Sequence, residues 1–206
     1  MTVEIGRRQQ QRLETEQLIK ATALALFVER GFEATTTKEI ADAAGVAHGT
    51  VFLVAGTKEA LLVKVMEERL RLVVSDRAAR LPSRPIMAQL VHVFDGLFDF
   101  YESEPGLSRV FLKGIMFFGE PIAKATYDEH MGRFSRYLAG LFDAAKTRGE
   151  VAKRTRSDGA AAHVLALYVF AVVGFLNSES RDRGALGAGF RAGLDALFRG
   201  LRAHKP

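Results

Sequence analysis

Hydrogen-bonding side chains are concentrated between positions 35 and 58, in the run TTTKEIADAAGVAHGTVF and the residues that follow it. Thr36 and Glu39 have the spacing of a capping box, in which a hydroxyl and a carboxylate each accept from the other residue's backbone amide at a helix start. Gly45 suits the left-handed conformation that ends a helix. A second short helix from about Ala47 would then present small and hydrogen-bonding side chains, as contacts to base edges in a DNA major groove require.

Flanking helices must hold this pair in place. Upstream, the stripe of an amphipathic helix stops before Gly31, after which Phe32 can fold back onto the helix. The residues of that stripe are Ile19, Thr22, Ala23, Leu26 and Phe27. Downstream, another helix opens near Lys58 and carries the apolar residues Leu61, Leu62, Val65 and Met66. The pattern predicts three helices and a connecting fourth, although a capped helix pair joined at a glycine can also be a plain packing unit.

From Ile19 to Leu62 the chain resembles the DNA-binding domain of the tetracycline-repressor family of bacterial transcription regulators. The matching runs are LALFVERGFEATT, KEIADAAGV, HGTVF and TKEALL. The resemblance implies that the threonine pair and Lys58 lie near DNA phosphates and that the second short helix, here called the recognition helix, reads bases. The candidate DNA-binding residues are Thr35, Thr36, Ala47, His48, Gly49, Thr50, Phe52 and Lys58.

The recognition helix departs from the family pattern at three positions. Ala47 replaces the usual serine and so removes a side-chain cap worth about 1 kcal/mol. Val54 and Ala55 replace a tyrosine and a phenylalanine, so a phosphate-binding hydroxyl and a supporting ring are missing. These departures predict a differently gripped operator or weaker binding, and they favour an alternative, a helical ligand-binding or protein-interaction dimer without specific DNA recognition. The residues that oppose this alternative are Thr36, Gly45, Thr50 and Lys58.

Charge does not by itself indicate DNA binding. The whole chain has a formal net charge of +5 and a pI near 9.6, but residues 1–58 hold seven basic and seven acidic side chains. The basic excess arises after Lys146. Arg7, Arg8 and Arg12 are expected to form a mobile N-terminal arm that follows the DNA backbone or minor groove, with a solvated charged tail as the other interpretation.

Composition indicates a cytoplasmic protein. Of 206 residues, 48% are hydrophobic, and none is cysteine, which fits a reducing compartment and excludes disulfides and thiolate metal sites. The first eighteen residues are mostly polar and do not form a signal peptide. Residues 159–176 lack a formal charge and reach the lower limit of a membrane span. We expect no membrane partner, because His163 interrupts this run and arginines flank it.

The remaining sequence predicts an all-α fold of about nine helices, because no run alternates as a strand would. The helices expected after the first three are 59–80, 86–103, 107–118, 122–148, 158–177 and 184–203. We expect a helix-turn-helix DNA-binding domain with its N-terminal arm in residues 1–58, and a larger helical ligand-binding and dimerisation domain in residues 59–206.

The last helix and the apolar segment before it are predicted to form a dimer interface. Leu186, Phe190, Leu194, Leu197 and Leu201 share one face, and the glycines between them favour close approach to another backbone. Together the two helices suit one half of a dimer's four-helix bundle, and the family resemblance implies the same surface. The other interpretation is a helix pair buried within one subunit.

The middle helices are rich in aromatic side chains, which are either ordinary core or the walls of a cavity. The resemblance implies a pocket for small molecules in this region, and the lack of a dense charge cluster favours an apolar or amphipathic ligand. The candidate pocket residues are His92, Phe94, Phe98, Phe111, Phe117, Tyr127, Phe134, Tyr168 and Asn177.

An enzymatic function is not expected. Asp128, Glu129 and His130 are adjacent on one predicted helix and so point apart, which argues against a metal site. We predict no catalytic residues, metal or cofactor. The sequence instead predicts a homodimeric, ligand-responsive regulator that binds double-stranded DNA, in which a small-molecule effector releases a repressor from a pseudo-palindromic operator.

Overall fold

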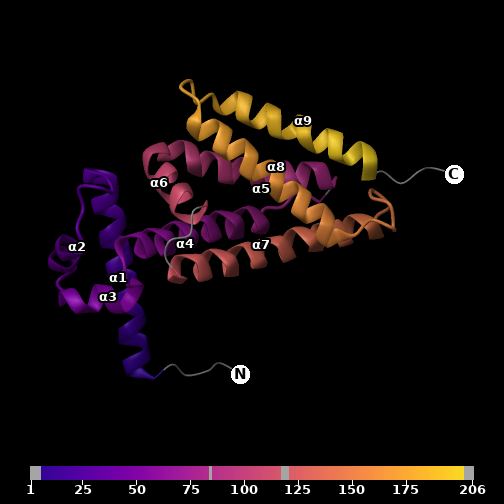
Figure 1. The fold of residues 1–206 in the computed structure, drawn as a ribbon. Helices are drawn as coiled ribbons and strands as arrows, with labels where there is room; N and C mark the ends of the chain where they lie inside the picture. The colour runs from indigo at the N-terminus through magenta and orange to yellow at the C-terminus, as the bar shows by residue number, and fades with distance from the viewer. Residues whose placement is uncertain (1–5, 84, 117–120, 202–206) are drawn as a thin grey trace. The chain divides into compact units, whose positions relative to one another are not determined.

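The computed structural model describes residues 6–83, 85–116 and 121–201, and within these ranges the chain is helical without any strand (Figure 1). The predicted all-α fold is confirmed. The helices are α1 (Arg7–Arg30), α2 (Thr37–Ala44), α3 (His48–Ala55), α4 (Lys58–Ala79), α5 (Ile86–Ser103), α6 (Pro105–Met116), α7 (Pro121–Thr147), α8 (Ser157–Asn177) and α9 (Arg183–Leu201).

The chain divides into two compact units. The N-terminal unit comprises residues 1–69 and 106–127, and the C-terminal unit comprises residues 70–105 and 128–206. Helix α4 contributes to both units, because it begins at Lys58 and ends at Ala79. The predicted boundary at residue 58 concerns the functions of the two domains and not the packing units, so it stays a prediction.

The helix boundaries differ from the prediction at two informative places. Arg7, Arg8 and Arg12 belong to the first turns of α1, so the prediction of a mobile arm at these positions is wrong. Helix α6 begins at Pro105, two residues before the predicted start at residue 107, because proline is tolerated where a helix has no amide partner to lose. The predicted end of this helix at Phe118 lies outside the described residues.

The core of the N-terminal unit is built from the apolar stripe of α1. Ile19 and Ala23 have no solvent exposure, and Phe27 is buried beside them. Gly31 follows with a φ of 86°, and the ring of Phe32 folds back to lie 5.2 Å from that of Phe27. The predicted contact across the end of α1 is confirmed.

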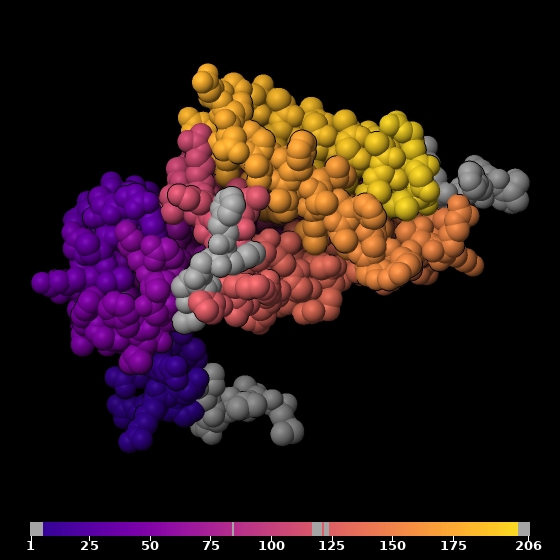
Figure 2. Space-filling model, viewed as in Figure 1, coloured from indigo at the N-terminus to yellow at the C-terminus, as the bar shows by residue number. Residues whose placement is uncertain are grey.

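The core of the C-terminal unit is a cluster of rings contributed by four helices. Phe94 of α5 is fully buried, and its ring centroid lies 4.8 Å from Phe190 of α9, 5.1 Å from Tyr168 of α8 and 5.6 Å from Phe134 of α7. Helices α8 and α9, orange and yellow in Figure 2, adjoin each other and both contact α5. This ring cluster therefore anchors the α8–α9 pair to the rest of the unit.

Ion pairs fasten α9 to α5 at the edge of the ring cluster. Arg183 donates to Asp99 Oδ1 at 2.8 Å and to Asp95 Oδ1 at 3.2 Å, while its guanidinium lies 5.3 Å from the ring of Phe98. Arg191, two turns further along α9, donates to Asp95 Oδ2 at 3.2 Å. Ion pairs thus hold both the start and the middle of α9 against α5.

Helix α8 is long and apolar enough to cross a membrane by length and composition, with a mean hydropathy of 2.1 over its most apolar window. Only 44% of that window is buried inside the protein. Val164, Tyr168 and Val172 are buried, whereas Phe170 is 81% exposed. The exposed part of α8 is therefore an apolar surface that the described residues leave uncovered.

Candidate nucleic-acid interface

Helix α2 begins with the predicted capping box. The Thr36 hydroxyl accepts from the amide of Glu39 at 3.2 Å, and a Glu39 carboxylate oxygen accepts from the amide of Thr36 at 2.8 Å. The amide and the hydroxyl of Thr36 both donate to this carboxylate, and together with the charge of Arg30 they lower the pKa of Glu39. The cap is worth about 1 kcal/mol, and it sets the first residue of the helix that supports α3.

The turn between α2 and α3 has the predicted left-handed glycine. Gly45 adopts φ 64° and ψ 33°, and the amide of Val46 donates to the carbonyl of Ala41 at 3.0 Å. A residue with a side chain would be strained at this backbone conformation. The turn therefore fixes the direction in which α3 leaves α2.

Helix α3, the recognition helix, has a buried side and a bare side. Val51 and Ala55 are each 2% exposed and attach the helix to the N-terminal unit. On the other side Phe52 is 46% exposed and Leu53 is 83% exposed, and Gly49 faces open space. Such a short helix with an uncovered outer face has the form of an element that enters a DNA groove.

The start of α3 is held by His48 instead of by a side-chain cap. Ala47 occupies the cap position and, as predicted, makes no side-chain bond to the helix. His48 Nε2 shares a hydrogen bond of 3.0 Å with Thr37 Oγ1 on α2, and its ring packs edge-on against Phe52 at 4.9 Å. This tie between α2 and α3 was not predicted, because two polar residues eleven positions apart carry no local signal.

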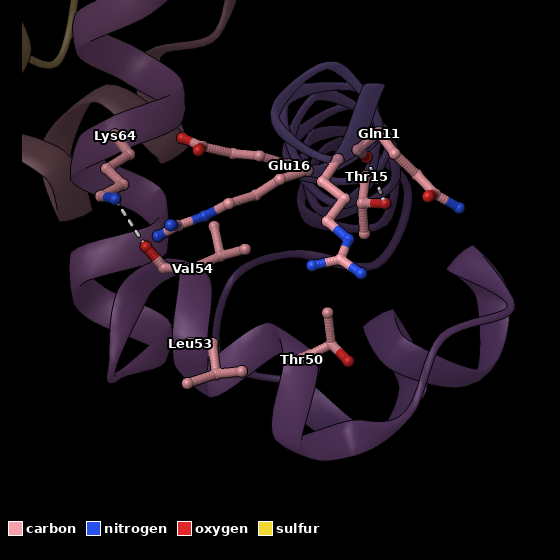
Figure 3. A pocket seen from close by; sticks show the side chains of 9 residues that line it. Gln11, Thr15, Glu16, Thr50, Leu53, Val54 and Lys64 are labelled. Carbon is pink, nitrogen blue, oxygen red and sulfur yellow. Dashed lines mark hydrogen bonds between the residues drawn. The ribbon is translucent and has the colours of Figure 1, made fainter. Parts of the chain in front are cut away.

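Lys64 of α4 holds the other end of α3. Its ammonium donates to the carbonyl oxygen of Val54 at 2.5 Å, as Figure 3 shows. The last carbonyls of a helix lack internal partners and carry partial negative charge, so a lysine there stabilises the end. The missing tyrosine at position 54 therefore does not leave the recognition helix unsupported.

Thr35 and Lys58, both predicted to lie near phosphates, make contacts within the domain. Thr35 is 1% exposed, and its hydroxyl donates to the carbonyl of Gly31 at 2.8 Å. Lys58 is half-buried, donates to the carbonyl of Phe32 at 2.8 Å and lies 4.2 Å from the centre of that ring. The phosphate contacts of both residues stay predictions, and each has a structural role that needs no DNA.

An open hollow of about 630 Å³ separates the first turns of α1 from α3. In Figure 3, Thr50 and Val54 rise from α3 toward Gln11 and Thr15 of α1, while Leu53 points the other way at the rim. The remaining residues that line the hollow are Arg8, Arg12, Glu16 and Lys64. Three cations against one carboxylate make this hollow basic, although the sequence of the domain is neutral in total.

The predicted ligand-pocket residues do not form one group. Phe94, Phe98, Phe134 and Tyr168 meet in the ring cluster of the C-terminal unit, where the Tyr168 hydroxyl donates to that of Tyr101 at 3.0 Å. His92 bonds the carbonyl of Arg77 at 3.1 Å, and Asn177 is exposed at the end of α8. Phe111 and Tyr127 belong to the N-terminal unit. Phe117 lies outside the described residues.

Sequence reasoning missed one polar group beside the ring cluster. The Tyr137 ring stacks on Phe134 at 6.4 Å, and its hydroxyl oxygen is buried with no hydrogen-bond partner among the described residues. Burial raises the pKa of Tyr137, so the group stays a protonated donor. A buried hydroxyl without a partner is costly and indicates a place where an acceptor can bind.

The residues predicted for the dimer interface are mostly covered by the chain itself. Leu186, Phe190 and Leu194 are 7%, 3% and 0% exposed, and Leu197 and Leu201 are half-buried. Beside them an open apolar groove of about 490 Å³ follows α8 and α9. The residues that line the groove include Leu167, Phe170, Gly174, Phe175, Leu186, Gly189, Phe190 and Gly193.

The elements of the N-terminal unit define a helix-turn-helix protein: a capped helix, a left-handed glycine and a supported helix with a bare outer face. Residues 19–65 match the family model of bacterial regulatory proteins of the tetR family. The chain therefore resembles this family over residues 19–65, as its sequence predicted. Over 91 residues it is also 32% identical to YerO, an uncharacterised HTH-type transcriptional regulator of Bacillus subtilis strain 168. That match covers 41% of this chain and 31% of YerO, so the chain spans about a third of that relative's length.

Solved structures share the fold over nearly the whole chain. FadR of Thermus thermophilus, a TetR-family transcriptional repressor in complex with lauroyl-CoA, is 21% identical with a TM-score of 0.76, over 93% of this chain and 97% of its own. FadR of Bacillus subtilis in complex with stearoyl-CoA is 18% identical with a TM-score of 0.70, over 90% and 99%. A TetR-family regulator of Pectobacterium atrosepticum is 19% identical with a TM-score of 0.74, over 96% and 98%.

Proposed function

We propose that this protein is a homodimeric repressor that binds a pseudo-palindromic operator and is released by a small amphipathic molecule. The proposal rests on one observation about the recognition helix. Val51 and Ala55 are buried on one side of it, while Phe52 and Leu53 are exposed on the other side. The capping box and the left-handed Gly45 fix its direction. An outer face maintained by so many internal contacts is suited to a rigid partner such as the major groove.

The basic hollow supplies contacts to the DNA backbone in this proposal. Arg8 and Arg12 lie one helical turn apart on α1, and both line the hollow with Thr50 of the recognition helix. A phosphate strand that passes the recognition helix would meet these guanidinium groups, because phosphates border the groove on both sides. Removing one such contact should reduce the slope of log binding constant against log salt by about one.

The uncovered half of α8 supplies the dimer surface. Under two-fold symmetry, Phe170 of one copy would enter the groove between α8 and α9 of the other, and the reverse contact would form at the same time. Gly189 lies on this groove with open space above it, so a second backbone could approach closely there. A partner at this position covers the apolar half of α8 without a membrane, in keeping with a cytoplasmic regulator.

The effector is proposed to carry an acyl or similar apolar chain with a polar end. The ring cluster offers an apolar environment, and the Tyr137 hydroxyl beside it offers a donor for a carbonyl oxygen. Two proteins of the same fold are complexed with lauroyl-CoA and stearoyl-CoA. Release of DNA requires that the ligand bind more tightly to a form in which the two recognition helices have the wrong separation.

A second candidate is a helical ligand-binding or interaction dimer without specific DNA recognition. It is favoured by the recognition helix itself, whose sequence HGTVFLVA contains neither arginine, lysine, asparagine nor glutamine. These are the residues that pair with guanine or adenine edges through two hydrogen bonds. This candidate predicts dimerisation and ligand binding without preference among DNA sequences.

Selection of random duplex DNA by the purified protein distinguishes the two candidates. The enriched sequence is titrated at physiological salt against a scrambled duplex of the same composition. We expect a palindrome bound about a thousandfold more tightly than the scrambled duplex. A folded, dimeric and ligand-free protein that enriches no sequence would refute the repressor and support the second candidate.

A further inference from the structure

The exposed face of the recognition helix is apolar. Leu53 is 83% exposed, and Phe52 beside it is 46% exposed. Gly49 lies one turn before Leu53 and has no side chain, so nothing of the helix covers Leu53 from that direction. An exposed leucine and phenylalanine on an eight-residue helix form a surface that water solvates poorly.

The recognition helix has two polar side chains, His48 and Thr50. His48 Nε2 is bonded to Thr37, and Thr50 is half-buried and turned toward α1 (Figure 3). A hydrogen-bonded reading of bases by Leu53 and Phe52 is impossible, because their side chains contain neither donors nor acceptors.

The major groove offers one apolar group to such a surface. Among the four bases, only thymine presents a carbon substituent, the C5-methyl group, on its major-groove edge. We propose that Leu53, assisted by Phe52, selects half-sites through contact with thymine methyl groups. This inference rests on the proposed binding to an operator, and it assigns the chemistry by which the operator is distinguished from other sequences.

Replacement of single thymines by deoxyuridine tests the inference, because deoxyuridine lacks only the methyl group and keeps every hydrogen-bonding atom. Each thymine of the selected half-site is replaced in turn, and binding of the full-length protein is titrated. Burial of one methyl group corresponds to an affinity change of about fourfold. We expect a loss of this size at one or two positions, and about the square of it when both half-sites carry the change.

A matched pair of variants assigns the methyl contact to its side chain. Leu53→Ala should bind the operator more weakly, and deoxyuridine at the sensitive position should then have no further effect. The substitution removes an exposed side chain and leaves Val51 and Ala55 in place, so the fold is retained. Val28→Ala, an exposed apolar residue of α1 at 54%, should keep the full fourfold response.

The outcomes separate this inference from the proposed function. Selective operator binding that no deoxyuridine replacement weakens would overturn the role of the methyl groups and leave the regulator intact. A deoxyuridine effect of equal size in the wild type, Leu53→Ala and Phe52→Ala would assign the methyl contact to other residues and overturn the inference as well. Failure to enrich any sequence would refute the operator proposal itself.

Discussion

Removal of the Phe170 side chain should separate the proposed dimer. Phe170 is 81% exposed in the single chain, and burial of a phenylalanine contributes about 1.5 to 3 kcal/mol. Two-fold symmetry places the contact twice in each dimer, so Phe170→Ala removes about 3 to 6 kcal/mol of association free energy. The dissociation constant of the dimer should therefore rise on the order of a hundredfold to ten-thousandfold.

Sedimentation equilibrium over a range of protein concentrations measures this change directly. Leu72→Ala provides the control, because Leu72 is 54% exposed on α4 and lies outside the α8–α9 pair. The control should leave the dissociation constant unchanged. Circular dichroism should show the same helix content for both variants, since neither side chain belongs to the core.

Operator binding gives a second measure of the same perturbation. A dimer reads two half-sites at once, so a monomeric Phe170→Ala protein should lose affinity for the palindrome but keep its affinity for an isolated half-site. An unchanged dissociation constant in Phe170→Ala would refute the placement of the dimer surface on α8 and α9.

Three further predictions concern individual side chains. Lys58→Ala should lower the free energy of unfolding by about 1 to 2 kcal/mol in thermal unfolding, because it removes a charged hydrogen bond and a ring contact. Unchanged stability would contradict this structural role. If the slope of log binding constant against log salt also falls by about one, Lys58 contacts a phosphate as predicted. The lowered pKa of Glu39 means that its stabilising contribution is complete above the ordinary glutamate value of about 4.3 and is lost as the pH falls through the lower folded-state value. Glu39→Gln should therefore lose less stability than the wild type between neutral pH and about pH 3 in denaturant titrations, and equal losses would contradict the assignment. Tyr137→Phe removes a buried hydroxyl without a partner and should leave the ligand-free protein equally or more stable, while it weakens binding of an acyl-CoA probe about tenfold by calorimetry; unchanged affinity would exclude Tyr137 from the ligand site.

Local signals in the sequence predicted the parts of the site that depend on local hydrogen bonds. Thr36, Glu39 and Gly45 are within ten positions of one another, and their spacing alone determines which amides they can reach. The contact of Phe27 with Phe32 follows for the same reason. Helix α5 has the predicted bounds, Ile86–Ser103, because Pro85 precedes it and a strong apolar pattern fills it.

Long-range contacts were beyond this kind of reasoning. The bond from Lys64 to Val54 and the burial of Thr35 depend on how α4 and α1 pack around the turn, which the identities of lysine and threonine do not reveal. Leu186 and Leu194 illustrate the same difficulty, since an apolar stripe shows that a face is covered but not by what. Phe170 is the reverse case. The sequence shows that it is apolar, but only the packing of the other side of α8 shows that its side chain is exposed.

The two lysines of α4 give the proposed regulation a physical route within the N-terminal unit. Lys58 bonds the loop that precedes α2, and Lys64 bonds the end of the recognition helix, so α4 is tied to the reading motif at two places. Helix α4 continues without interruption to Ala79, in the unit that contains the ring cluster. In the proposed regulation, a ligand that favours one position of α4 would act on the recognition helix through the hydrogen bond to its carbonyl end. To convert a fully bound operator into a mostly free one, from 99:1 to 1:99, that preference must reach about ten-thousandfold. Two equivalent ligands in a symmetric dimer share this requirement, so a preference of about a hundredfold at each site is sufficient.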